Sequence, residues 1–191
     1  MITIIAILGK TSTSKDTIAR YMKKVYNIEP VVSYTTRPIR SSEIEGREHY
    51  FITDTEMDAI IVDKDSLLAF TQFPETGYRY CATTKSISDD KVMSYIIDPA
   101  GLEWLRENRP DVRIIAICTE LEDDMIIERA KNRGDDPEAI AARLSSESDM
   151  FDSFINTGSY NAKIYTGTSV EEIYEKVDSI LSACNILPII E

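Results

Sequence analysis

The 191-residue sequence has few cysteines and almost no histidine: Cys81, Cys118 and Cys184 are its three cysteines, and His49 is its one histidine. Three widely spaced thiols do not form a disulfide framework. They also do not match the paired ligands of a structural zinc site. A chain with so few thiols fits a reducing compartment, so we expect a cytoplasmic protein.

Long apolar runs and an excess of basic residues are also missing. No apolar stretch is long enough to cross a bilayer. The opening MITIIAILG has no basic leader and no small-residue cleavage site, so we expect a strand there instead of a targeting segment. The 33 acidic and 21 basic residues give a formal charge of −12. This charge argues against a nucleic acid polymer or a membrane surface as partner. A small phosphorylated molecule is still a possible ligand, because a few clustered arginines can bind it locally.

Strand and helix patterns alternate along most of the chain, without repeats or a low-complexity linker. The expected strands are 2–8, 30–36, 92–98, 112–119 and 161–167, and the expected helices are 15–26, 99–109, 121–134, 136–151 and 169–184. Strands that alternate with helices predict an α/β fold, with a parallel sheet covered by helices on both faces. The surface helices give no indication of the oligomeric state.

Residues 35–90 interrupt this alternation with short, Thr-, Ser-, Tyr- and Arg-rich strands of antiparallel character. We interpret them as a small mixed β subdomain inserted into the core. The prediction is a single domain, with a core of 1–34, 91–134 and 155–191, an insertion of 35–90 and a helical lid of 135–154.

Residues 9–17, GKTSTSKDT, follow the first strand and open the first helix. They nearly match the phosphate-binding loop G-x-x-x-x-G-K-[ST], whose backbone N–H groups and helix dipole bind phosphate oxygens. The candidate donor-binding residues are Gly9, Thr11, Ser12, Thr13, Ser14, Lys15, Asp16 and Thr17. Lys15 is expected to reach the terminal phosphates of a nucleotide.

The loop departs from the pattern at Ser14, where the second glycine belongs, and at Asp16, where a hydroxyl belongs. If position 14 needs a positive φ, serine costs on the order of 1 kcal/mol there relative to glycine. Asp16 suits Mg²⁺ as a hard carboxylate ligand but would repel phosphate without the metal. Thr17 follows directly and offers a substitute hydroxyl, so we expect the metal at Asp16 and Thr17.

A second phosphate-binding pattern lies in VVSYTTRPIRSSEIEGREHYF, residues 31–51. Arg37 and Arg40 stand three residues apart beside Ser33, directly after a strand. Because the planar guanidinium fork binds phosphate through two hydrogen bonds, this cluster predicts a second phosphate site apart from the first.

These motifs together resemble the guanylate kinase family. VSYTTRPIRSSEIEGREHYF is similar to its V-S-x-T-T-R-x-x-R-x-x-E stretch, and FTQFPETGYRYCATTKSI to its A-x-F-x-x-x-Y-Y-G-[ST] segment. IIDPAG resembles the family's I-D-x-Q-G, and ERAKNRGDDPEAIAARL its arginine-bearing lid. The resemblance extends over about residues 2–184 in the family's order.

The resemblance implies a role for each matching residue. Ser33, Arg37, Arg40 and Tyr80 would hold the acceptor monophosphate. Asp98 would lie near the metal and the acceptor. Arg129, Arg133 and Arg143 would close over the transferring phosphoryl group together with Lys15. His49 takes the place of a phosphate-contacting tyrosine, with Tyr50 next to it, and an imidazole donates to phosphate more strongly when protonated.

The sequence departs from the family where guanine is recognised. Ala69 falls on the family's glutamate, Ala82 on its Ser/Thr and Cys81 on its glycine, with Thr83 and Thr84 adjacent. An alanine does not bind guanine as a carboxylate does, and the loss of such contacts costs a few kcal/mol. The family's Asn-Asp near the adenine pocket falls close to Thr166 and Gly167.

Three functions remain open. The first is an ATP- and Mg²⁺-dependent nucleoside monophosphate kinase that phosphorylates GMP or a related monophosphate. The second is a kinase with a non-guanine acceptor, which Ala69 and Ala82 favour. The third is a non-catalytic binding module like the guanylate-kinase-like domains of scaffold proteins, which the altered loop favours and the retained Lys15 and lid arginines oppose.

Overall fold

The computed structural model describes residues 2–40, 43–74, 76–87 and 91–189. Its main sheet has five parallel strands in the order β2-β7-β1-β8-β9. The strands are β1 (Thr3–Leu8), β2 (Glu29–Pro30), β7 (Val92–Ile96), β8 (Arg113–Glu120) and β9 (Ala162–Tyr165). All six residues of the central β1 are buried, as its unbroken apolar run predicts.

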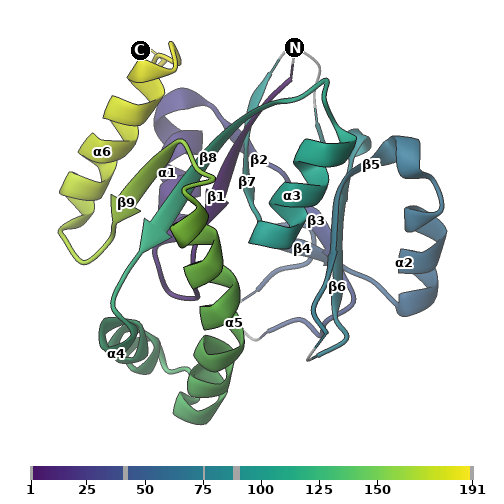
Figure 1. Cartoon of the computed structure of the whole chain (residues 1–191), viewed down its shortest axis with the longest axis horizontal. Coiled ribbons are helices and arrows are strands. Elements are labelled where there is room, and N and C mark those ends of the chain that lie inside the picture. Colours follow the sequence, from purple (N-terminus) through teal and green to yellow (C-terminus); the bar gives the residue numbers. More distant parts are fainter. Residues whose placement is uncertain (1, 41–42, 75, 88–90, 190–191) are drawn as a thin grey trace.

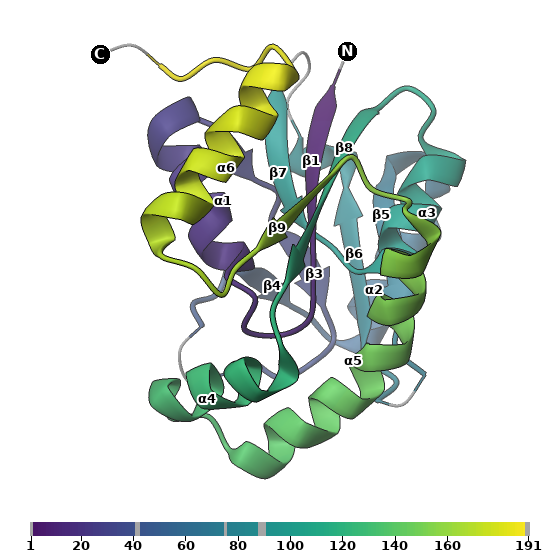
Figure 2. The same cartoon turned by 60° about the vertical axis from the view of Figure 1, so that its left-hand side comes forward.

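Helices cover both faces of this sheet, as the alternation of patterns predicts. Figures 1 and 2 show α1 (Lys15–Tyr26) and α6 (Val170–Ala183) on one face, and α3 (Pro99–Asn108) and α5 (Pro137–Thr157) on the other. The alternate residues of β1 therefore enter two separate cores, Ile5 and Ile7 with α1 and α6, and Ile4 and Ala6 with α3 and α5.

A second sheet contains β4 (His49–Phe51), β3 (Ser33–Thr35), β6 (Arg79–Thr83) and β5 (Leu67–Gln72), in that order. It is mixed, because β3 and β4 are parallel while β6 is antiparallel to both β3 and β5. The single strand predicted over 30–36 is therefore wrong. Pro30 pairs with Ser94 in the main sheet, whereas Ser33 already pairs with His49 in the second.

α4 (Asp123–Arg133) and the first half of α5 extend below the main sheet (Figure 1). The lid predicted over 135–154 falls mostly within α5. Gly134 ends α4 in a left-handed conformation, and Asp136 caps α5, with Pro137 in its first turn. Ile126 and Ala130 of α4 pack against Ile140 and Leu144 of α5 in a small separate core. α5 extends to Thr157, beyond the predicted end at 151.

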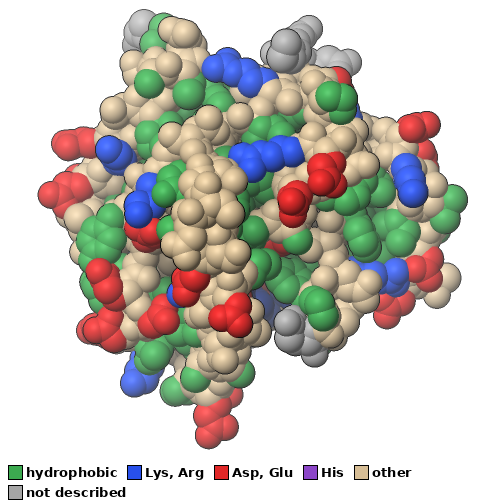
Figure 3. Space-filling view, in the orientation of Figure 1, with side chains coloured by type: hydrophobic (Ala, Val, Ile, Leu, Met, Phe, Trp, Pro, Cys, Tyr) green, Lys and Arg blue, Asp and Glu red, His purple; other side chains and the backbone are tan. Residues whose placement is uncertain are grey.

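Acidic side chains are spread widely over the face seen in Figure 3, with lysines and arginines between them. This distribution agrees with the formal charge of −12. Among the described residues, no helix combines the length and the apolar character that crossing a membrane requires.

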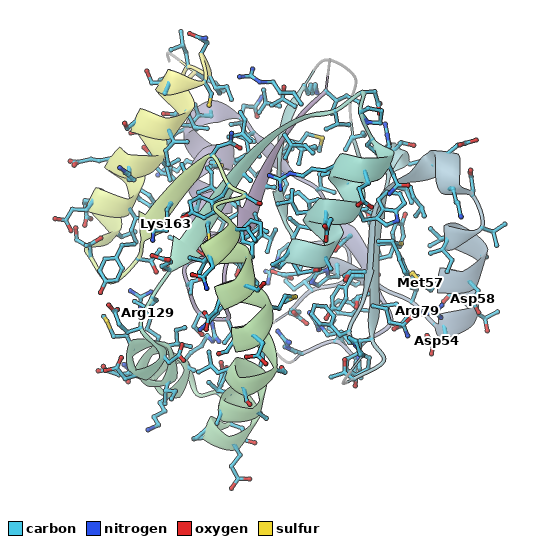
Figure 4. All side chains as sticks on the ribbon, in the orientation of Figure 1. Asp54, Met57, Asp58, Arg79, Arg129 and Lys163 are labelled. Atoms are coloured by element: carbon cyan, nitrogen blue, oxygen red, sulfur yellow. The ribbon has the colours of Figure 1, made fainter. Side chains whose placement is uncertain are left out.

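The insertion also contains an unpredicted helix, α2 (Asp54–Ile61), which packs Met57 against the second sheet. Its signal is local: Thr53 and Glu56 form a capping box with both hydrogen bonds present. Figure 4 shows Arg79 of β6 beside Asp54 and Asp58 of α2, and its guanidinium lies 2.6 and 2.5 Å from their carboxylates. The remaining connections include two 3-10 turns, Lys64–Ser66 and Thr84–Ser86.

Candidate active site

The loop between β1 and α1 is tightly fitted against β8. Gly9 has a φ of 153°, and a Cβ at this position would lie 2.0 Å from the Thr119 hydroxyl oxygen. The Thr13 hydroxyl lies 2.7 Å from that of Thr119, which donates to the Leu8 carbonyl. The first glycine is therefore required because the strand behind the loop leaves no room for a side chain.

Ser14, in place of the second glycine, has a φ of 62° in the left-handed region, as the pattern predicts for that position. The Ser14 hydroxyl accepts a hydrogen bond of 3.2 Å from the Arg129 guanidinium. This bond offsets part of the cost of the left-handed backbone conformation. Arg129, labelled in Figure 4 beside α4, also donates to the Thr166 carbonyl. Arg129 thus connects the loop to the residue that follows β9, and its guanidinium lies at the loop that is predicted to bind the donor phosphates.

Lys15 begins α1 and folds back over the loop. Its ammonium donates to the carbonyls of Gly9 and Lys10 at 2.7 and 2.6 Å. Burial, together with the nearby Arg143 charge, lowers the pKa of Lys15 to about 8. The lysine is therefore placed within the loop, where a bound phosphate would stabilise its charged form.

α4 and α5 lie directly on the loop. The Lys10 ammonium lies 3.3 Å from Asp123 of α4 and 3.2 Å from Asp152 of α5. Arg133 donates to the Ser12 hydroxyl at 3.2 Å and pairs with Asp135. These contacts hold both helices, and the predicted lid residue Arg133, against the loop.

The acceptor cluster is built around Arg37, whose side chain is 6% exposed. Its guanidinium donates to both carboxylate oxygens of Glu43, at 2.7 and 2.5 Å, and to the Tyr80 hydroxyl at 3.1 Å. Burial alone would raise the pKa of Glu43, but the hydrogen bonds from Arg37 and from the Arg40 backbone hold it at about 2. Glu43 is therefore an anion that orients Arg37.

His49 joins this cluster through a 2.8 Å hydrogen bond between its Nδ1 and the Ser33 hydroxyl. Its ring also meets the edge of Tyr80. Burial and the Arg37 charge lower the pKa of His49 to about 4. The imidazole is therefore neutral near pH 7, and an anionic phosphate beside it would favour its protonated form.

Two predicted acceptor residues are not brought to this face. Tyr50 alternates with His49 along β4 and stacks on Tyr34, at 5.1 Å between ring centroids, on the opposite side of the sheet. Thr83 alternates with Ala82 along β6, so it shares the face of Cys81 and Arg79 toward α2.

The Thr83 hydroxyl is buried without a hydrogen-bond partner among the described residues.

Asp98 lies where the prediction places it, at the end of β7. It caps α3 by accepting from the Gly101 N–H at 2.9 Å, and it is hydrogen-bonded to the Thr71 side chain. Burial raises the pKa of Asp98.

Ala69 and Ala82 face each other across β5 and β6. They are 1% and 0% exposed and pack in the core that covers one face of the main sheet. The two positions at which the family carries guanine-binding side chains are thus occupied here by alanines that pack in the core.

Asp16 offers an exposed carboxylate in the first turn of α1, and Thr17 is half-buried beside it. The Asp16 charge acts favourably on Lys15 and Arg133. Within the described ranges, no three His, Cys, Asp or Glu side chains gather to hold a metal. The donor set fits Mg²⁺, which binds one or two carboxylates and takes its other ligands from phosphate and water.

Arg143 of α5 acts electrostatically on both phosphate-binding candidates. Its charge lowers the pKa of Lys15 in the loop, second to burial, and it has the same effect on Arg40 in the acceptor cluster. Positive charge contributed by three separate parts of the chain suits the spread negative charge of a transferring phosphoryl group.

Two residues of the site carry no role in the sequence prediction. Glu43 stands at the last letter of the V-S-x-T-T-R-x-x-R-x-x-E pattern, so its position was available as a signal. Glu147 of α5 accepts a hydrogen bond from the Thr11 backbone N–H of the loop at 2.7 Å. Its spacing from Arg143 indicates only a shared helix face, so no local pattern shows the contact with the loop.

A guanylate kinase family model matches residues 1–184 of this chain. The guanylate kinase of Thermosynechococcus vestitus is 31% identical over 152 residues, which cover 74% of this chain and 75% of that protein. The guanylate kinase of Streptomyces coelicolor is 29% identical over 144 residues, 72% of this chain and 71% of that protein.

A crystal structure of guanylate kinase from Anaplasma phagocytophilum aligns with a TM-score of 0.65 at 22% identity, over 95% of this chain and 85% of that one. This confirms the predicted α/β fold with its small mixed β sheet. The chain belongs to the guanylate kinase family.

Proposed function

We propose that this protein is an ATP-dependent nucleoside monophosphate kinase that transfers the γ-phosphoryl group of ATP to GMP or a related monophosphate. The observation that carries the proposal is the contact of α5 with the loop, where Glu147 accepts from the Thr11 N–H at 2.7 Å and from the Arg143 Nε at 2.5 Å. The charge of Arg143 also acts on Lys15 and Arg40. A binding module that does not bind ATP does not need a lid arginine beside this loop. Family membership supports the same reaction.

In this proposal residues 9–17 bind the donor polyphosphate through backbone N–H groups and the Lys15 ammonium. Arg37, Arg40 and Ser33 hold the acceptor phosphate, with Arg37 fixed by Glu43. The reaction is an in-line phosphoryl transfer, so the protein supplies positioning and charge, and no covalent intermediate is needed.

Arg133 and Arg143 balance the charge that spreads over the transferring group. Asp16 and Thr17 would hold Mg²⁺, which neutralises phosphate charge when it is bound. Tyr50 and Thr83 take no direct part, because their strands turn them away from Arg37. The half-buried Cys184 and the buried Cys81 and Cys118 are free thiols, which supports a reducing cytoplasmic location.

Initial rates of ADP release with ATP–Mg²⁺ and a panel of monophosphates test the proposal. We expect turnover with at least one acceptor, and the catalytic efficiencies rank GMP against the other bases. Calorimetry with ATP–Mg²⁺ separates the rival binding module, which would give no heat. Donor binding without turnover of any monophosphate would refute the kinase assignment.

A further inference from the structure

One carboxylate lies within the group of cations that is proposed to receive phosphate. Glu147, in the middle of α5, has a side chain that is 12% exposed. One of its oxygens accepts from the Thr11 N–H at 2.7 Å, and the other accepts from the Arg143 Nε at 2.5 Å. Its charge also raises the pKa of Lys15 against the effect of burial.

These partners are of the kind that bind a phosphate group: a backbone N–H of the loop, an arginine and a nearby lysine ammonium. A carboxylate resembles a phosphate in its charge and its accepting oxygens, and it makes the same charge-assisted hydrogen bonds. Glu147 is therefore an anion that binds the loop and Arg143 as a phosphate would.

We propose that Glu147 is an affinity-setting residue that occupies part of the site of the donor's terminal phosphate and is displaced when the donor binds. The proposal rests on the proposed function, because it takes residues 9–17 as the donor site. Two anions in one cluster of cations repel each other, so the donor must break both contacts of Glu147 before Arg143 is free to meet it.

A purely structural role makes the opposite prediction. If Glu147 served only to hold α5 on the loop and to orient Arg143, its loss would loosen the site and weaken donor binding. If it competes with phosphate, its loss strengthens donor binding. The sign of the change in affinity therefore separates the two roles.

Glu147→Gln tests this, because glutamine keeps the shape and removes the charge. We expect calorimetric titration with ATP–Mg²⁺ to give about tenfold tighter binding than wild type, the size of one charge-assisted hydrogen bond. In turnover, the KM for ATP should fall while kcat stays within about twofold. The matched control is Asp149→Asn, which removes an equal charge at an exposed position two residues along the same helix.

Asp149→Asn should leave the affinity within about twofold of wild type. Equal or weaker binding by Glu147→Gln, or equal tightening by both variants, would overturn the proposal and leave the kinase assignment intact. Absence of ATP–Mg²⁺ binding by all three proteins would instead refute the donor site itself, and this proposal with it. Urea unfolding of Glu147→Gln checks that the variant is folded, and Glu147→Ala repeats the test without the amide.

Discussion

At the scale of single residues, the acceptor cluster keeps one ionisable ring neutral. Burial and the Arg37 charge lower the pKa of His49 from 6.5 to about 4, with Arg40 acting in the same sense and Glu43 and Asp16 against it. The unfolded chain therefore takes up a proton below pH 6.5 that the native protein does not. The resulting stability is complete above pH 6.5 and is lost as the pH falls toward 4.

We expect His49→Gln to reduce this loss. Between about pH 7 and about pH 5, the free energy of unfolding of the variant should fall by about 2 kcal/mol less than that of wild type, as measured by urea denaturation. Glu43 titrates lower, near 2, so it does not obscure this interval. Identical pH dependence of the two proteins would show that His49 is not held neutral.

Ser14 combines a backbone strain with a compensating hydrogen bond to Arg129. Ser14→Gly removes both, so its free energy of unfolding should lie within about 1 kcal/mol of wild type. Ser14→Ala keeps the positive φ and loses the bond, so it should be less stable than wild type by about 1 kcal/mol. An alanine variant as stable as wild type would mean that the bond to Arg129 contributes nothing.

At the scale of elements, the acceptor side depends on how closely β5 and β6 pack. Ala69 and Ala82 are paired across these strands and are buried. We expect Ala69→Glu to destabilise the protein by more than about 3 kcal/mol, because the larger side chain overpacks the core and buries a charge. Placing the family's glutamate at position 69 would therefore not, by itself, give this protein the family's contacts with guanine.

Urea denaturation of Ala69→Glu against Gln72→Glu measures this effect. Gln72 is the exposed last residue of β5, so its substitution introduces the same side chain outside the core. If Ala69→Glu is as stable as Gln72→Glu, there is room for a carboxylate beside Ala82. The acceptor pocket would then be open to a guanine-reading side chain.

The elements that the sequence predicted well are those with local signals. α1 matches its predicted range of 15–26, and α6 begins at the capping box of Ser169 and Glu172. The change of sheet between β2 and β3 was missed because it depends on partners far along the chain, Ser94 for one strand and His49 for the other. α2 was missed as well, because it has only eight residues and its capping box is the main sequence signal for it.

Within the site, too, features with a local sequence signal could be predicted, and contacts between distant parts of the chain could not. The spacing of the loop and of the two acceptor arginines was enough to propose both phosphate-binding regions, because each motif is contiguous. The bracing position of Arg129 and the contact between Glu147 and Thr11 join residues more than 110 positions apart. No local pattern encodes such contacts, so they appear only when the lid helices are placed on the loop.

At the scale of the whole molecule, the main sheet carries the proposed donor loop, the second sheet carries the proposed acceptor cluster, and α4 and α5 lie on the loop (Figure 1). Arg143 of α5 acts electrostatically on Lys15 of the loop and on Arg40 of the cluster. The central claim is that a phosphoryl group passes directly from a donor in the loop to an acceptor at Arg37 and Arg40.

The most direct test uses ATP labelled on its γ-phosphate together with Mg²⁺ and GMP or the acceptor preferred in the panel. The account predicts that the label appears in the nucleoside diphosphate formed from that acceptor. It also predicts that Lys15→Met abolishes the transfer while a variant at exposed Lys24 retains it. Label found only in free phosphate, or left entirely in ATP, would contradict the account.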